Sequence, residues 1–218
     1  MAYVFFDLGN VLVHFDPLRA CRNVAALVGC GPEDVEQEMY ASGLELRYER
    51  GEFSDEEFVA ALCQRLAVAT VGAPVKTAEI LEAMGRMFTP HTAMEEILAS
   101  LQQRGVPMGI LSNTCAAHWR WIQDQQWRVS SGWFRDAVLS YEVGCLKPEA
   151  EIYRVAASLA GVPAAKIFFT DDREENVAAA RGAGWHAVLF TDPDQLRTDL
   201  AHFGIPLQGT AGGKIHDA

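Results

Sequence analysis

Cysteine is scarce in this sequence of 218 residues, and none of the five cysteines falls in a C-x-x-C pair. Their odd number and their spacing argue against a disulfide framework and against a cysteine zinc site. The first residues, MAYVFFDLG, lack the basic stretch of a signal peptide, and their apolar run is too short to cross a membrane. We therefore expect reduced thiols, a cytoplasmic location and no membrane partner.

Basic residues are also few, with 18 Lys and Arg against 29 Asp and Glu, so that the formal net charge is −11. Nucleic-acid binding surfaces need clustered Lys and Arg, and this balance argues against such a partner. An anionic substrate is still compatible with the charge, provided that a metal ion or a placed lysine offsets the overall field. The sequence contains no internal repeats, which argues against a repeat architecture.

Short apolar runs that end in polar or small residues recur along the chain and predict strands. They lie at residues 3–7, 107–113, 136–140, 166–172 and 186–190. Helical patterns separate them, and several of these end on a glycine, as at Gly105, Gly161 and Gly204. Strands that alternate with helices in this way predict a doubly wound, Rossmann-like parallel sheet of the α/β class.

Residues 16–88 interrupt this alternation of strands and helices. They contain amphipathic helical stretches and no convincing strand. Ser54 followed by Glu57 fits a capping box at the start of one of these helices. We predict a helical cap over 16–88, inserted into an α/β core made of residues 1–15 and 89–207. The Gly-rich tail at 208–218 is expected to be disordered.

Residues able to carry chemistry lie where predicted strands end or helices begin. Asp7 follows the first strand, Ser112 and Asn113 follow the second, Asp172 ends the TDD sequence, and Lys147 precedes a helix. Ligands of doubly wound sheets bind beyond the carboxyl ends of the strands, where these side chains would gather. Carboxylates can hold Mg²⁺ or attack a phosphoryl group, and a hydroxyl and a lysine can bind phosphate oxygens.

The order of these motifs resembles the haloacid dehalogenase superfamily. The sequences FFDLGNV, GILSN, LKPEAEIY and TDD stand where that family has its four motifs, and the resemblance covers nearly the whole chain. It implies that Asp7 is the nucleophile, that Lys147 is catalytic and binds substrate, and that Ser112 orients a phosphate oxygen. It also implies a Mg²⁺ site made by Asp7, the Gly9 carbonyl and Asp172. Asn113 is a further candidate for phosphate contact.

Three more specific sequence segments look like the branch that contains glucose-1-phosphate phosphatases. They are DLGNVLV, ERGEFSDEEF and LSNT. The resemblance implies a Mg²⁺-dependent phosphatase that hydrolyses a small phosphorylated metabolite, a sugar phosphate by preference, through an aspartyl phosphate. The oligomeric state stays open at this point.

Gly9 departs from the family pattern, because the family has an Asp at this position that serves as general acid and base. A metal-independent haloacid-type dehalogenase therefore stays an alternative, although such enzymes carry a Tyr at this position. A pseudo-enzyme that only binds a phosphorylated ligand is the other alternative. His14 and Asp16 are the nearest titratable groups in sequence that could replace the acid, and Glu49 is a cap residue that could face the substrate, as is its neighbour Arg50.

Overall fold

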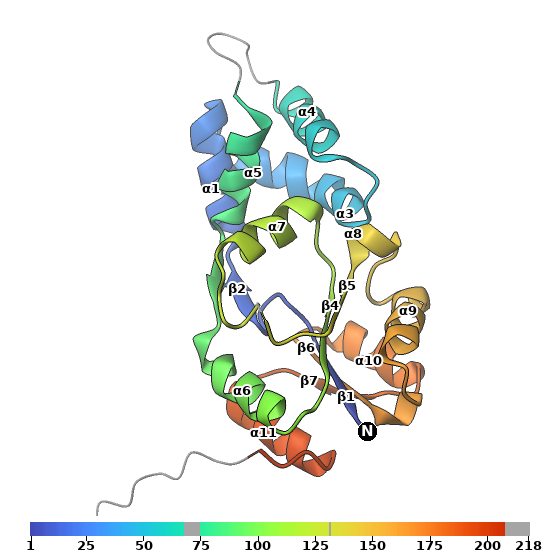
Figure 1. Cartoon of the computed structure of the whole chain (residues 1–218). Helices are drawn as coiled ribbons and strands as arrows, with labels where there is room; N and C mark the ends of the chain where they lie inside the picture. The colour runs from blue at the N-terminus through green and yellow to red at the C-terminus, as the bar shows by residue number, and fades with distance from the viewer. Residues whose placement is uncertain (68–74, 131, 208–218) are drawn as a thin grey trace, which may run out of the picture.

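A five-stranded parallel sheet forms the centre of the computed structural model, which describes residues 1–67, 75–130 and 132–207 (Figure 1). The strands follow the order β5-β4-β1-β6-β7. Their bounds are Tyr3–Phe6 (β1), Met108–Ser112 (β4), Asp136–Leu139 (β5), Ile167–Asp171 (β6) and His186–Leu189 (β7). Each coincides with a predicted apolar run, so the predicted doubly wound α/β fold is confirmed. The tail at 208–218 lies outside the described residues.

Both faces of this sheet are covered, which explains why its strands are apolar without alternation. On β1, Tyr3 and Phe5 belong to one buried cluster, whereas Val4 and Phe6 belong to another. The first cluster includes side chains of α9 (Ala150–Ala160) and α10 (Glu174–Gly182), and the second includes side chains of α6 (Glu95–Gln103) and α11 (Pro193–His202). Successive strand residues point to opposite faces, so one short strand contributes to two hydrophobic cores.

The remaining helical elements of the α/β part are short, apart from α7. They are η2 (Thr92–Met94), α7 (Ala116–Asp124), α8 (Ser140–Val143) and η3 (Ala164–Lys166). The helix α9 ends at Gly161, whose φ of 65° is in the left-handed region that favours glycine, as the sequence predicts. Among the described residues, none of the helices combines the length and the apolar composition needed to cross a bilayer.

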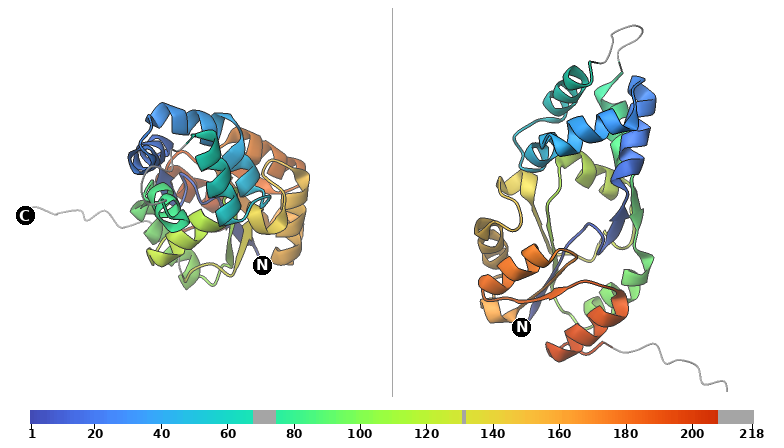
Figure 2. Two further views of the ribbon diagram at one scale, coloured as in Figure 1. Left: turned by 90° about the horizontal axis from the view of Figure 1, so that it is seen from above. Right: turned by 180° about the vertical axis from the view of Figure 1, so that it is seen from behind.

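The helices between β2 and β3 form a layer of their own, which we call the helical region. Figures 1 and 2 show it at the end of the molecule opposite α11, above the carboxyl ends of the sheet strands. Its elements are α1 (Pro17–Val28), α2 (Pro32–Glu36), the π-helix η1 (Gln37–Ala41), α3 (Leu44–Glu49), α4 (Asp55–Arg65) and α5 (Thr77–Gly85). The capping box of α4 is present, because Ser54 Oγ accepts from the Glu57 amide while the Glu57 carboxylate accepts from the Ser54 amide.

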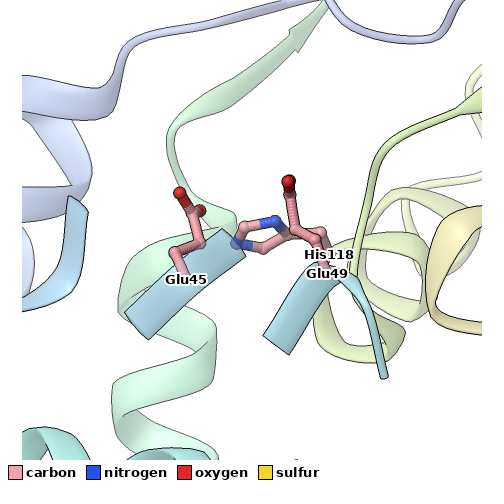
Figure 3. A group of neighbouring side chains, drawn as sticks. All are labelled: Glu45, Glu49 and His118. Carbon is pink, nitrogen blue, oxygen red and sulfur yellow. The ribbon is translucent and has the colours of Figure 1, made fainter. Parts of the chain in front are cut away.

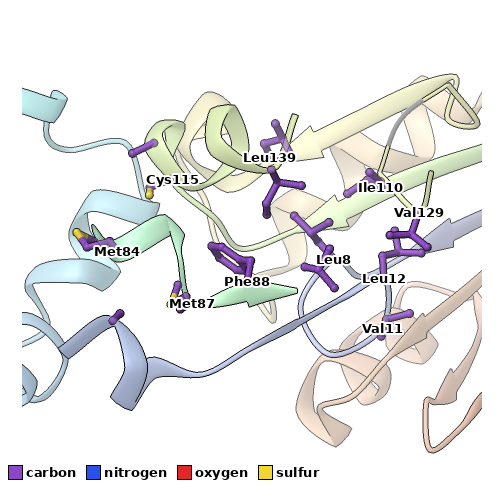
Figure 4. Packing of buried hydrophobic residues seen from close by; sticks show 14 of the residues in the cluster. Leu8, Val11, Leu12, Met84, Met87, Phe88, Ile110, Cys115, Val129 and Leu139 are labelled. Carbon is purple, nitrogen blue, oxygen red and sulfur yellow. The ribbon is translucent and has the colours of Figure 1, made fainter. Parts of the chain in front are cut away.

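A two-stranded antiparallel ribbon, which the sequence analysis misses, joins the helical region to the sheet. β2 (Val13–Phe15) enters the region, β3 (Phe88–Pro90) leaves it, and His14 pairs with Thr89. Each strand has three residues, too few to show a periodic pattern. Figure 4 shows buried side chains from this ribbon, the loop after β1 and the strand β4 packed together, so the connection shares the hydrophobic core.

Candidate active site

The candidate site lies at the junction of β1 and β6, which is the point where the strand order reverses direction. Phe6 pairs with Thr170, and the Asp7 amide donates to the Thr170 carbonyl at 2.9 Å. Asp7 directly follows β1 and Asp171 ends β6, so both lie at the same edge of the sheet. Crevices at such switch points are the usual ligand sites of doubly wound folds.

Lys147 bridges these two carboxylates. Its Nζ lies 2.7 Å from Asp7 Oδ1 and 2.6 Å from Asp171 Oδ2, and the residue is only 5% exposed. Burial by itself lowers the pKa of Lys147, but the two carboxylates outweigh it and raise the pKa above its usual value. A buried ammonium is thus fixed at the end of β1.

Asn113 holds the backbone of Lys147 in place. Its Nδ2 donates to the Lys147 carbonyl at 2.9 Å, and its Oδ1 accepts from the Lys147 amide at 2.7 Å. Both functional groups of the Asn113 side chain are used in this way, so it is a positioning contact in this structure. Its contact with phosphate stays a prediction.

The two adjacent aspartates at the end of β6 have different surroundings. Asp171 Oδ1 accepts from the Arg173 amide and from Asn176 Nδ2, each at 2.9 Å, while its Oδ2 meets Lys147. Asp172 Oδ2 accepts from Asn10 Nδ2 at 2.9 Å, and it is more accessible than Asp171. Asp171 therefore holds the lysine in place, and Asp172 is the more accessible of the two carboxylates.

Carboxylate oxygens of Asp7, Asp171 and Asp172 lie within 4.8 Å of one another. Burial is the main reason why the pKa of Asp7 is raised to about 7; Lys147 opposes this rise, whereas Asp171 and Asp172 add to it. One lysine faces three carboxyl groups, so a further cation would relieve their repulsion. The donors are oxygens only, which fits a hard divalent cation such as Mg²⁺.

The structure brings most of the sequence-predicted site residues to this edge. Asp7, Lys147 and Asp172 converge, and Ser112 ends β4, 2% exposed. Gly9 lines the adjoining pocket. The roles of these residues stay predictions.

His14 and Asp16, the nearest candidates for the missing acid, have other partners. The His14 ring packs against the His91 ring with centroids 4.3 Å apart. Asp16 caps α1 by accepting from the Arg19 amide and pairs with Arg22. Neither residue lines the pocket beside Gly9.

That pocket has a volume of about 90 Å³ and is enclosed jointly by the strand ends and the helical region. Its lining residues are Leu8, Gly9, Phe15, Tyr40, Glu45, Glu49, Met87, Phe88, Ser112, Asn113, Thr114 and His118. Glu49 is a cap residue expected from the sequence to face the substrate, whereas Glu45 and His118 are not predicted. The spacing of four between the two glutamates is the one available signal, since it places them on one face of a helix.

The end of α3 is fastened to the α/β part next to this pocket. Ser140 Oγ donates to the Glu49 carbonyl at 2.6 Å and also contacts the Thr114 backbone after β4. Arg50 forms a bidentate ion pair with Glu149, near Lys147. A Cβ at Gly51 would lie 2.3 Å from the Tyr141 carbonyl oxygen, so only glycine allows this close approach. The helical region therefore contacts the sheet edge directly.

Comparison with known proteins agrees with this geometry. Residues 1–184 match the family model of the haloacid dehalogenase-like hydrolases. The chain belongs to this family. It is also 27% identical to the phosphatase MT3486 of Mycobacterium tuberculosis, in a match that covers 94% of this chain and 96% of that protein. The sesquiterpene phosphatase astK of Aspergillus oryzae is 24% identical, over 86% of this chain and 88% of that protein.

Solved structures show the same fold in this hydrolase family. A HAD family enzyme from Bacteroides thetaiotaomicron, solved in complex with magnesium and inorganic phosphate, superposes with a TM-score of 0.77. It is 25% identical, and the match covers 90% of this chain and 98% of that chain. The haloacid dehalogenase-like resemblance of the sequence is thus confirmed at the level of the family, whereas the glucose-1-phosphate phosphatase branch stays a prediction.

Proposed function

We propose that this hydrolase is a Mg²⁺-dependent phosphatase that cleaves a small phosphorylated metabolite through an aspartyl phosphate on Asp7. The observation that carries the proposal is the Lys147 ammonium held between Asp7 and Asp171 at the switch point of the sheet. The phosphatase names of two relatives and the magnesium and phosphate in a structural neighbour support it.

Asp7 would act as the nucleophile. Its Oδ1 already accepts from Lys147 and from the Leu8 amide at 2.7 Å, and among the described residues no donor contacts Oδ2. One carboxylate oxygen is thus oriented by the protein while the other is available. Lys147 would bind a phosphoryl oxygen and offset the charge that grows in the transition state. Ser112 would orient a second oxygen.

Asp7 and Asp172, with the Gly9 carbonyl, are the proposed ligands of Mg²⁺. When bound, the ion supplies positive charge that offsets the phosphoryl oxygens and keeps Asp7 ionised. Asn10 would orient Asp172 for this purpose through the hydrogen bond described above.

The helical region would act as the cap that excludes water and contacts the leaving group. We propose residues 16–88 as this cap and residues 1–15 and 89–207 as the catalytic core. The pocket of about 90 Å³ favours a small leaving group, and its carboxyl and amide groups suit hydroxyls. A sugar phosphate is therefore the proposed substrate class.

A panel of phosphorylated metabolites, assayed for phosphate release with Mg²⁺ and with excess chelator, tests this proposal. We expect release from at least one small sugar phosphate and its loss in chelator, followed by recovery when Mg²⁺ is added back. Full activity in chelator would overturn the metal requirement. Halide release from 2-haloacids without metal would favour the dehalogenase alternative, and phosphate binding without turnover would favour the pseudo-enzyme.

A further inference from the structure

Gly9 leaves the proposed reaction without a proton donor at its usual place. The backbone there is not in the left-handed region, and a Cβ would meet only the ring of Phe15, at 3.0 Å. A side chain is therefore missing where space for one is nearly available. The leaving oxygen of an alkyl phosphate still needs a proton, and the described residues around the pocket must supply it if the enzyme is to act on such substrates.

Two carboxyl groups and an imidazole gather in the pocket that Gly9 lines. Glu45 and Glu49 come from α3, one turn apart, and His118 comes from α7, as Figure 3 shows. One carboxylate oxygen of each glutamate and a ring nitrogen of His118 lie within 4.8 Å of one another. We call these residues the Glu–His cluster. It belongs to neither the Asp7 site nor the ribbon.

The side chain of His118 has a ring nitrogen whose hydrogen bonding is not satisfied within the Glu–His cluster. The residue is 2% exposed, and among the described residues its Nε2 has no hydrogen-bond partner. A buried polar atom without a partner is unfavourable and uncommon. An imidazole nitrogen without a partner can accept a hydrogen bond from a protonated carboxyl group. The Glu–His cluster is therefore arranged to hold or transfer a proton.

The protonation states agree with that arrangement. Burial raises the pKa of Glu49 to about 7, although Lys147 and Arg173 pull it down. Burial and then Glu49 raise the pKa of Glu45 well above its usual value. Burial lowers the pKa of His118 to about 4, so the imidazole is neutral near pH 7. The cluster thus carries carboxyl protons at neutral pH beside a neutral base.

Glu49 is the glutamate of the Glu–His cluster on which the charge of Lys147 acts. The field of Lys147 acts on Glu49, whereas Glu45 is influenced chiefly by burial and by Glu49. The backbone of Glu49 is also fixed, because its carbonyl accepts from Ser140 Oγ. The other titratable groups that sense Glu49 are the Tyr40 hydroxyl and the Cys115 thiol, and burial raises the pKa of both.

We propose that Glu49 is the general acid and base of this enzyme and replaces the carboxyl group that Gly9 lacks, with Glu45 and His118 as positioning residues. This rests on the proposed phosphatase function. In the first step an Asp7 oxygen bonds to phosphorus while the bond from phosphorus to the leaving oxygen breaks. That oxygen takes the Glu49 proton and departs as an alcohol.

In the second step a water oxygen bonds to phosphorus and the bond from Asp7 to phosphorus breaks. The Glu49 carboxylate takes one proton of this water, phosphate leaves, and Asp7 is again a carboxylate. Glu49 ends protonated, as it began, so the cycle needs no other reactant.

Two substrates with different leaving groups test the assignment in Glu49→Gln. A primary-alcohol phosphate such as a sugar 6-phosphate needs a proton donor, whereas p-nitrophenyl phosphate releases a stable phenolate without one. General acid help contributes ~10²–10⁴-fold, so we expect kcat/KM to fall by that factor for the sugar phosphate and by less than ~10-fold for p-nitrophenyl phosphate. Glu56→Gln, an exposed change on α4, is the matched control and should alter neither rate.

The pH profile and a rescue variant distinguish a catalytic role of Glu49 from a structural one. We expect the alkaline limb of the sugar phosphate profile to disappear in Glu49→Gln. Gly9→Asp in that background should restore at least ~10-fold of the lost rate, because it returns a carboxyl group to the usual place. Glu45→Gln and His118→Asn should shift the alkaline limb while keeping most of the rate.

Several results would overturn the assignment. Equal losses on the two substrates would show that Glu49 binds or supports the fold and does not transfer a proton. A bound metal ion that is lost in both Glu45→Gln and Glu49→Gln would make the Glu–His cluster a metal site. If the wild type hydrolyses p-nitrophenyl phosphate but no alkyl phosphate, the chain is a phosphatase without this acid. If it hydrolyses neither, the proposed function itself fails and the assignment falls with it.

Discussion

The strand-end carboxylates and the Glu–His cluster are two groups of acidic residues, and they differ in how their charge is balanced. Asp7 and Asp171 share the ammonium of Lys147, and the other carboxylate oxygen of Asp171 accepts from the Arg173 amide and from Asn176 Nδ2. Glu45 and Glu49 have no such bridging cation among the described residues, and the neighbouring His118 nitrogen is unpartnered.

This difference teaches what each group is suited for. A carboxylate fixed by a cation and by hydrogen bonds is held in one orientation, which suits a nucleophile and a metal ligand. A carboxyl group whose pKa is raised to near neutrality without a bridging cation can give up and take back a proton, which suits proton transfer. The pKa values of Asp7 and Glu49 are both raised to about 7, so the two groups differ in what holds them and not in their charge alone.

Removal of the proposed nucleophile, Asp7, should have the largest effect of the substitutions considered. Asp7→Asn replaces a carboxylate by an amide, which is a poor nucleophile and a weaker metal ligand. We expect phosphate release to fall by ~10³-fold or more, about 4 kcal/mol in the activation free energy. The measurement is kcat on the best substrate of the panel, with the exposed Asp194→Asn as control. Retention of more than about a tenth of kcat would contradict the role of Asp7.

Removal of Lys147 should leave the negative charge of the strand-end carboxylates uncompensated. Lys147→Met leaves Asp7 and Asp171 buried and unpaired, so we expect the free energy of unfolding to fall by about 3–5 kcal/mol at pH 8. The lysine is charged well below its raised pKa, so its contribution is fully present there. Urea unfolding measures this, with the exposed Lys166→Met as control.

Two further observations sharpen the role of Lys147. Lys147→Arg should not restore activity, because a planar guanidinium does not replace a compact ammonium in a buried site. Unchanged stability and kinetics in Lys147→Met would show that the residue only begins the segment before α9.

The smallest effect is expected from a substitution in the Glu–His cluster. It should raise the stability of the protein, whereas Lys147→Met should lower it. The pKa of Glu45 is raised on folding, so the folded state binds more protons than the unfolded chain and loses stability as pH rises from the ordinary glutamate pKa towards the raised one. Glu45→Gln cannot ionise. We therefore expect its Tm at pH 8 to exceed that of the wild type by ~2–4 °C, about 1 kcal/mol, and the gain to vanish near pH 4. A loss of stability at pH 8 would mean that a cation balances this cluster.

Much of the α/β part could be predicted from the sequence, because the information is local. The runs YVFF and IFFTD are apolar throughout since both sheet faces are covered, and the helix α9 stops at Gly161 since its backbone there is left-handed. The motif residues Asp7 and Asp172 stand directly at strand ends, so parallel topology alone brings them together.

The hydrogen bonds that position Lys147 and Asp172 could not be predicted from the sequence. Asn113 bonds to both main-chain groups of Lys147, and Asn10 donates to Asp172. The ribbon of β2 and β3 is too short to leave a pattern in either strand. These contacts join segments that are distant in the chain, and no local pattern specifies them.

By itself, the sequence determined the order of the strands and helices, the carboxylates and lysine at their ends, and the absence of a side chain at Gly9. Only the tertiary structure decided which residues face that gap. It places Glu49 and His118 in one pocket by docking α3 against α8 and by laying α7 beside it, and there Glu49 is half-buried and His118 buried. Protonation depends on burial and on neighbouring charge, and both are properties of the folded chain.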